Sequence, residues 1–319
     1  MALRFDDHWI WDFWIVRKES DYHVFYLQAP RSAQGEDSRH WSVTIGHAVS
    51  NDLTRWRVLP NALAPGPPGS WDDYTTWTGS IVEHEGVWNM FYTGGKRSED
   101  GLIQRIGLAT SSDLVHWHRH PDNPVMVSDP RWYEQLNLEN WHDQAWRDPW
   151  IYQDPDTQRW HALITARSNL GPADERGVIG HARSDDLVDW DVLPPLTEPG
   201  HFGHLEVPQL VEAQGRHYLL FSVGASEYSR RRTLLPHIQP ETGTHYGILS
   251  DPSSFQLAGE AGAWRPLSPL YAGKLIQIGA RWCFLGWLER NAHGHFVGEI
   301  SDPLRVEFSP EGELTLHPL

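Results

Sequence analysis

One motif recurs along this chain, and it limits the possible fold more than any other feature of the sequence. Three clear copies read IGHAVSNDLTRW, IGLATSSDLVHW and IGHARSDDLVDW, at residues 45–56, 106–117 and 179–190. Two weaker copies, YGILSDPSSF and VGEISDPLRVEF, occupy residues 246–255 and 297–308. The copies return at intervals of roughly 50 to 75 residues, which indicates a repeat architecture.

Each copy follows two runs that are rich in aromatic and β-branched residues, as β-strands prefer. In the first unit these runs are WDFWIV and YHVFYLQ, at residues 11–16 and 22–28. Each unit is therefore expected to form three strands, an S-x-D-L-x-x-W corner and a short outer strand. Five such units predict an all-β chain folded as a five-bladed β-propeller.

We expect residues 1–319 to form a single propeller catalytic domain, with no appended C-terminal β-sandwich. The blades share one ring, so no domain boundary is expected inside it. The long loops at 61–74, 128–145 and 226–244 are expected to shape the mouth of a site.

The aspartate of each clear corner has a structural interpretation. Asp52, Asp113 and Asp186 recur at the same offset in three units. Short acidic side chains cap turns, and the tryptophan that ends the motif can pack between blades. We therefore interpret these acids as turn residues and not as catalytic groups.

Composition excludes several classes of partner. The formal net charge is −16, from 26 Lys and Arg against 42 Asp and Glu. Such a surface repels phosphate backbones and anionic lipids, so neither nucleic acid nor a membrane is expected as a partner. The chain also has 18 Trp, more than core packing requires. Exposed indole faces are typical of sites that stack on sugar rings, so a small carbohydrate or oligosaccharide is the expected partner.

Cys283 is the single cysteine, so neither an intrachain disulfide nor a cysteine-based zinc site is expected. HWHRH at residues 116–120 is interpreted as an exposed strand end and not as a metal site. No metal and no cofactor are predicted. The N-terminus carries acids where a signal peptide would be apolar, and no apolar run is long enough to span a membrane, so a cytoplasmic protein is expected.

Three acids stand at comparable places in the predicted units. The first strand of each propeller blade lines the central channel, and Asp12, Asp148 and Glu206 all lie near the start of such a strand. Like charges that converge on one channel are costly for a purely structural ring. Two carboxyl groups on either side of a glycosidic bond are what glycoside cleavage needs. Hydrogen bonding is expected to keep Asp12 ionised and Arg147 to keep Asp148 charged, whereas apolar neighbours favour the protonated form of Glu206.

Further residues near these acids are candidates for binding a sugar. The tryptophans offer apolar faces, the hydroxyl and amide side chains offer hydrogen bonds, and arginine can donate two parallel hydrogen bonds. The predicted substrate-binding residues are Trp11, Trp14, Trp41, Trp77, Thr78, Ser80, Arg147, His142, His204 and Gln209.

The motifs WDFWIV, GHAVSNDLTRW, WTGS, FYTG, WRDPWIY and LEVPQLVE occur in that order. Together they resemble the five-bladed fructan-active glycoside hydrolases, namely family 32 (invertases, levanases and inulinases) with features of the levansucrases of family 68. The resemblance runs from about residue 11 to residue 300. It implies that Asp12 is the nucleophile, Asp148 the transition-state stabiliser and Glu206 the acid/base of a retaining β-fructofuranosidase-type reaction. Transfer of the fructosyl group to another sugar is compatible with the same resemblance. Arg147, Trp77 and Trp11 would line the fructosyl subsite.

The chain departs from the family 32 pattern at several places. WDFW is closer to the levansucrase form of the nucleophile motif, Leu27 replaces the glutamine of FYQ, and Gln209 replaces an acid after the acid/base glutamate. These changes leave the three acids in place and bear on the substrate.

Two alternatives remain open at this stage. One is an inverting pentosidase of the family 43 type, in which Asp12 would activate a water molecule. The other is a propeller that binds carbohydrate without cleaving it. The sequence does not specify the substrate, the linkage, endo or exo action, transfer against hydrolysis, or the oligomeric state.

Overall fold

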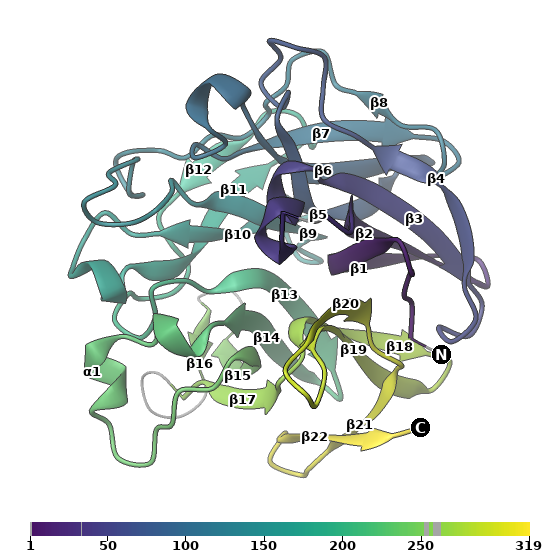
Figure 1. Cartoon of the computed structure of the whole chain (residues 1–319). Coiled ribbons are helices and arrows are strands. Elements are labelled where there is room, and N and C mark those ends of the chain that lie inside the picture. Colours follow the sequence, from purple (N-terminus) through teal and green to yellow (C-terminus); the bar gives the residue numbers. More distant parts are fainter. Residues whose placement is uncertain (1, 33, 252–254, 258–262) are drawn as a thin grey trace.

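The computed structural model describes residues 2–32, 34–251, 255–257 and 263–319. In this part of the chain the strands form five sheets arranged around a centre as the blades of a β-propeller, which confirms the predicted fold (Figure 1). The chain runs through the blades in sequence order, from the purple first blade to the yellow fifth blade.

The first three blades have four strands each, paired antiparallel in chain order from the inner to the outer strand. Blade one contains β1 (His8–Lys18), β2 (Asp21–Pro30), β3 (Thr44–Ser50) and β4 (Arg57–Leu63). Blade two contains β5 (Thr75–His84), β6 (Val87–Gly95), β7 (Arg105–Ser111) and β8 (His118–Arg119). Blade three contains β9 (Trp146–Gln153), β10 (Trp160–Arg167), β11 (Gly177–Ser184) and β12 (Asp191–Leu193).

Blades four and five differ from this plan on their outer side. Blade four contains β13 (Glu206–Ala213), β14 (Arg216–Val223) and β15 (Gly243–Asp251), and both β16 (Gln256–Leu257) and β17 (Arg265–Ser268) pair with β15. Blade five contains β18 (Tyr271–Ile278), β19 (Arg281–Arg290), β20 (Phe296–Ile300), β21 (Leu304–Phe308) and β22 (Leu314–Pro318). Both β20 and β21 pair with β19, and β22 is the outer strand.

The fifth copy of the motif therefore does not form the predicted corner. Its residues Leu304–Phe308 form strand β21, which pairs with β22. A proline follows Asp302 directly where the clear copies place a leucine with positive φ, and the proline ring fixes φ at about −65°. Part of the fourth copy, residues 252–254, lies outside the described residues.

The three clear corners have the predicted structural role. In blade one, Asp52 Oδ1 accepts the backbone N–H of Thr54 at 2.9 Å and of Arg55 at 2.8 Å. Asp113 and Asp186 make the equivalent bonds in blades two and three. The next residue has a positive φ in every case: 58° at Leu53, 71° at Leu114 and 69° at Leu187.

The core lies mainly between neighbouring blades, and the corner tryptophans contribute to it. Trp117 of blade two packs edge to face on Phe25 of blade one, with ring centroids 5.7 Å apart. Trp190 of blade three packs in the same way on Phe91 of blade two, at 5.5 Å. The recurring tryptophan thus joins each of these blades to the one before it.

The ring closes where the N-terminal segment meets blade five. Leu3 forms an antiparallel bridge with Ile300 at the end of β20. Arg31, directly after β2, donates Nη2 hydrogen bonds to the carbonyl oxygens of Phe5 and Val297. Among the described residues, no helix is long and apolar enough to cross a membrane.

Candidate active site

The inner strand of each blade carries an irregularity near the position of the predicted site. The strand register shifts at Trp11/Phe13 in β1, at Trp77/Gly79 in β5, opposite Leu163/Thr165 in β9, at Glu206/Gln209 in β13 and at Tyr271/Lys274 in β18. A β-bulge bends its strand and turns a side chain away from the regular alternation. The backbone has positive φ at three of these places: 55° at Asp148, 53° at Val207 and 50° at Ala272.

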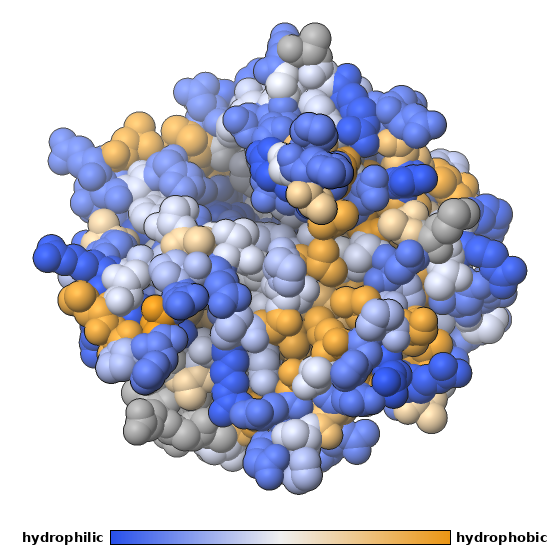
Figure 2. Space-filling model, turned by 60° about the horizontal axis from the view of Figure 1, so that its bottom comes forward, coloured by the Kyte–Doolittle hydropathy of each residue, from blue (hydrophilic) through white to orange (hydrophobic). Residues whose placement is uncertain are grey.

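These bulges surround a cavity of about 600 Å³. Figure 2 shows this face of the molecule hollowed near its centre. Most of the residues predicted from the sequence line the cavity: Trp11, Asp12, Trp41, Trp77, Thr78, His142, Arg147, Asp148 and Glu206.

Four predicted substrate-binding residues do not line it, and we assign them structural contacts instead. Trp14 is 1% exposed and stacks on Phe25 in the core, because it lies beyond the bulge of β1. Ser80 Oγ accepts the N–H of Ile151 from the neighbouring blade. The Gln209 side chain bonds both backbone groups of Leu275 and so ties β13 to β18. The fourth residue, His204, is 1% exposed in side chain and lies behind the cavity wall.

Asp12 lies on the bulge of β1 and contacts the next blade. Thr78 Oγ1 donates a hydrogen bond of 2.7 Å to Asp12 Oδ2. Burial raises the pKa of Asp12, and the nearby Glu206 charge adds to this, whereas the Thr78 hydrogen bond opposes it. Asp12 is thus a carboxylate whose ionised form depends on hydrogen bonding.

Asp148 is 5% exposed and accepts hydrogen bonds through Oδ2 from Thr165 Oγ1 at 2.8 Å and from the Val207 N–H at 3.3 Å. Burial raises the pKa of Asp148 to about 7, against the opposing effect of Arg147. Arg147 thus favours the charged form of Asp148, as expected from the sequence, but burial opposes it. The Arg147 guanidinium comes no closer than 3.6 Å to Asp148 Oδ2, because its hydrogen bonds go elsewhere.

Arg147 binds three side chains through their oxygens and also contacts His204 Nδ1 through Nη2, at 3.2 Å. Its Nη2 donates to Glu206 Oε1 at 2.6 Å. Its Nη1 donates to Gln104 Oε1 at 2.9 Å and to Asp143 Oδ2 at 3.1 Å. On the other side, the Tyr271 hydroxyl donates to Glu206 Oε2. Both oxygens of Glu206 are thus held by donors from different blades.

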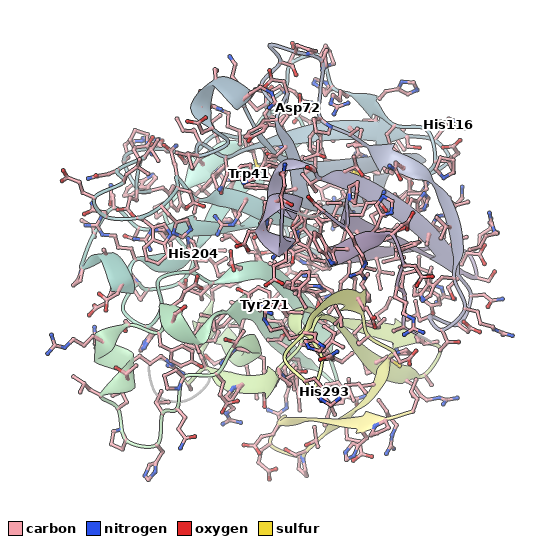
Figure 3. The ribbon with its side chains drawn as sticks, viewed as in Figure 1. Trp41, Asp72, His116, His204, Tyr271 and His293 are labelled. Atoms are coloured by element: carbon pink, nitrogen blue, oxygen red, sulfur yellow. The ribbon has the colours of Figure 1, made fainter. Side chains whose placement is uncertain are left out.

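Figure 3 shows Trp41, His204 and Tyr271 around the centre of the ring, whereas His116 and His293 lie toward its periphery. Trp41 belongs to the short helix η1 (Glu36–Trp41) and is 41% exposed. It stacks on Tyr74 with ring centroids 5.1 Å apart. This pair provides a flat apolar surface at the edge of the cavity, suited to a sugar ring.

Sequence reasoning missed several polar residues of the site. Tyr271 and Lys274 lie on the inner strand of blade five, which was recognised as a strand but has no acid to draw attention to it. Lys274 is 4% exposed, and its Nζ donates to the Val207 carbonyl at 3.1 Å. Burial lowers the pKa of Lys274 to about 8, while Asp12 and Asp148 raise it. Arg39, a cavity residue from η1, lies against the rings of Trp11, Trp287 and Phe296.

Within the part of the chain that the structure describes, two groups of side chains have the atoms to hold a metal ion. They are His142 with Asp143 and His204, and His204 with Glu206 and Glu227. The surroundings disfavour a cation, because Arg147 already binds Asp143 and Glu206. In addition, Trp141 Nε1–H donates to His204 Nε2 at 2.9 Å and occupies that lone pair.

A five-bladed ring with acids that line its cavity is the arrangement used by the propeller class of glycoside hydrolases. Within that class, the chain belongs to family 32, because a profile of the glycosyl hydrolases family 32 N-terminal domain matches residues 12–248. This confirms the family resemblance found in the motifs.

Two curated relatives illustrate the range of the family. Sucrose-6-phosphate hydrolase of Escherichia coli is 28% identical over 230 residues, which make up 69% of this chain and 43% of that protein. Bifunctional 6(G)-fructosyltransferase/2,1-fructan:2,1-fructan 1-fructosyltransferase of Allium cepa is 38% identical over 180 residues, 55% of this chain and 26% of that protein. The chain therefore spans less than half the length of these relatives.

Solved structures agree on the fold. The Bombyx mori GH32 β-fructofuranosidase superposes with a TM-score of 0.73 at 22% identity, covering 100% of this chain and 64% of that one. Inulosucrase from Halalkalicoccus jeotgali gives 0.75 at 20% identity, covering 99% of this chain and 90% of that one. At these identities the likeness establishes the five-bladed architecture.

Proposed function

We propose that this propeller is the catalytic domain of a retaining β-fructofuranosidase-type hydrolase. Asp12 is the nucleophile, Glu206 the acid/base and Asp148 the stabiliser of the transition state. The observation that carries the proposal is the common placement of the three acids, on bulges of inner strands that line one cavity.

In the first step, Asp12 attacks the anomeric carbon of the fructosyl ring while Glu206 protonates the departing oxygen. In the second step, Glu206 takes a proton from water as that water attacks the covalent intermediate. Asp148 accepts hydrogen bonds from ring hydroxyls, and these strengthen as positive charge develops on the ring. The Thr78 hydroxyl supports the ionised form of Asp12 that the attack requires.

A fructoside of one to a few sugar units suits a cavity of about 600 Å³. The stacked pair of Trp41 and Tyr74 supplies a surface for a second ring. Solved relatives include a Bombyx mori enzyme mutant in complex with sucrose and a Cichorium intybus fructan 1-exohydrolase mutant in complex with 1-kestose. A sugar hydroxyl in place of water at the second step would give fructosyl transfer.

The test is to incubate the protein with sucrose, inulin, levan and aryl arabinosides, and to identify the released sugar and its first-formed anomer by NMR. We expect fructose with retained configuration. Release of arabinose, or inversion, would instead support the pentosidase of the family 43 type. Sugar binding without turnover would support a carbohydrate-binding propeller.

Asp12→Asn tests the nucleophile directly. Substrate binding should persist, because the aromatic walls are intact, while turnover falls by about three or more orders of magnitude. The matched control is Asp122→Asn, the same change at an exposed residue after β8. Near-normal turnover of Asp12→Asn would refute the assignment.

A further inference from the structure

A third carboxyl group lies beside the proposed acid/base, and it comes from a loop without any recognised motif. Glu227 ends the short helix η4 (Ala225–Glu227) after β14. Its carboxyl oxygen, an oxygen of Glu206 and a ring nitrogen of His204 all lie within 4.8 Å of one another. The Glu227 side chain is 23% exposed, so it also reaches solvent.

The surroundings of Glu206 pose a problem for a proton donor. Arg147 donates to one carboxyl oxygen and Tyr271 to the other. Both contacts favour the carboxylate, since a hydrogen bond donated to the charged form stabilises that form. The departing sugar nevertheless needs a proton. A nearby group must therefore keep a proton at this end of the cavity.

His204 lies between the two glutamates. Trp141 Nε1 is 2.9 Å from His204 Nε2, and Arg147 Nη2 is 3.2 Å from Nδ1, so both ring nitrogens face donors. Glu206 Oε1 and Glu227 Oε1 are each 3.9 Å from Nδ1, beyond hydrogen-bonding distance. The ring therefore fixes the space between the two carboxyl groups without bonding to either.

The charges facing these groups fix the direction of the effect. Burial lowers the pKa of His204 well below its usual range, and Arg147 and Arg167 add to this, so the ring stays neutral. Burial, followed by the Glu206 charge, raises the pKa of Glu227 to about 7. The Gly224 N–H and Arg147 oppose that rise, and Asp143 adds to it. Tyr271 also faces both glutamates. The negative charge of Glu206 thus favours the protonated form of Glu227.

We propose that Glu227 is a positioning residue for the acid step: its carboxyl group, close to Glu206 and separated from it by the His204 ring, favours retention by Glu206 of the proton given to the departing sugar. This role rests on the proposed function. When the glycosidic C–O bond breaks, Glu206 gives its proton to the leaving oxygen and becomes a carboxylate. The attacking water of the second step returns one proton, so the pair ends the cycle as it began.

The experiment is the pH profile of kcat/KM for wild type and Glu227→Gln, on sucrose and on β-fructofuranosyl fluoride. Fluoride leaves with little need of a proton, so it isolates the acid step. With the neighbouring charge removed, the basic limb on sucrose should move down by about one pH unit or more. At pH 7.5 this lowers kcat/KM on sucrose about tenfold, while the rate on the fluoride stays within about twofold.

The matched control is Glu139→Gln, the same change at an exposed residue of the 128–145 loop, which should leave both profiles unchanged. An unmoved basic limb in Glu227→Gln would overturn the proposal. An equal loss on both substrates at every pH would also overturn it, because it would indicate direct contact with the substrate. If Glu227→Gln fails to fold, Glu227→Ser, which also removes the charge, must give the same shift. A wild type that cleaves no fructoside would refute the proposed function and this role with it. A wild type that cleaves fructosides, with an unmoved basic limb in Glu227→Gln, would refute the role of Glu227 alone.

Discussion

Lys274 is a buried cation that the site holds at a cost to the fold, so its removal should increase stability and decrease activity. The side chain is 4% exposed and has a single hydrogen bond, to the Val207 carbonyl oxygen. Lys274→Met keeps a similar length and shape while it removes the charge. The two effects should therefore separate in one variant.

The magnitude follows from the lysine pKa, which burial lowers from 10.5 to about 8. At about 1.36 kcal/mol per pKa unit, the charged form costs the folded state about 3.4 kcal/mol at pH 7. Between pH 8 and 10.5 the unfolded chain binds the additional proton, so this cost fades as the pH rises through that window. Loss of the hydrogen bond to Val207 destabilises the variant by about 1 kcal/mol. The net gain for Lys274→Met should be about 2 kcal/mol at pH 7.

The assay is urea denaturation at pH 7 and at pH 10.5, together with melting temperature. A domain of this length has an unfolding entropy of about 0.7 kcal/mol/K, so the gain corresponds to about 3 °C. The gain should vanish at the higher pH. In parallel, the acidic limb of kcat/KM should move to higher pH, because Asp12 and Asp148 lose a neighbouring cation.

The control is Lys18→Met at the end of β1, where the side chain is partly exposed and the change should stay within about 0.5 kcal/mol. A Lys274→Met variant that is less stable than wild type at pH 7 would refute the reasoning. It would mean that attraction to the acids outweighs desolvation of the ammonium.

Three further changes test other parts of the structure. Thr78→Val removes the hydroxyl that lowers the pKa of Asp12, so the acidic limb of kcat/KM should move to higher pH, and an unchanged limb would contradict this contact. Asp113→Ala removes the acceptor of two backbone N–H groups and should lower the free energy of unfolding by about 1–2 kcal/mol in urea titrations. Its kcat/KM should stay unchanged, since a catalytic defect in the folded variant would exclude a purely structural role. Burial lowers the pKa of His47 and of His181 to about 3. Below pH 6.5 the unfolded chain therefore binds more protons than the folded protein, so the free energy of unfolding decreases as the pH falls toward 3. His181→Leu should flatten that decline in urea midpoints, and an equally steep decline would place its cause elsewhere.

The fold was predictable because the corner motif is local and repeats. Asp52 and its counterparts satisfy backbone groups a few residues away, so their pattern is visible in the sequence without any tertiary information. The fifth unit departed from the prediction where its motif places a proline directly after the aspartate.

The candidate site was predictable only in part, because bulges change the alternation of side chains. Strand periodicity alone places Trp14 and Ser80 near the acids, but a shift of one residue turns a side chain to the other face. Both are instead buried between blades. Glu227 was missed for another reason: it reaches Glu206 from a loop, and no local pattern encodes that contact.

The contacts between the N-terminal segment and blade five have a consequence for how the protein is made. Leu3 and Arg31 leave the ribosome before any of blades two to five, yet their partners Ile300 and Val297 belong to blade five. Blade one therefore lacks these contacts until blade five has been synthesised, and the ring of the nascent chain stays open until then. Blades two and three can complete their shared core earlier. Chaperones that protect exposed strand edges would thus be needed most at the beginning of the sequence, although its pairing partner lies near the end.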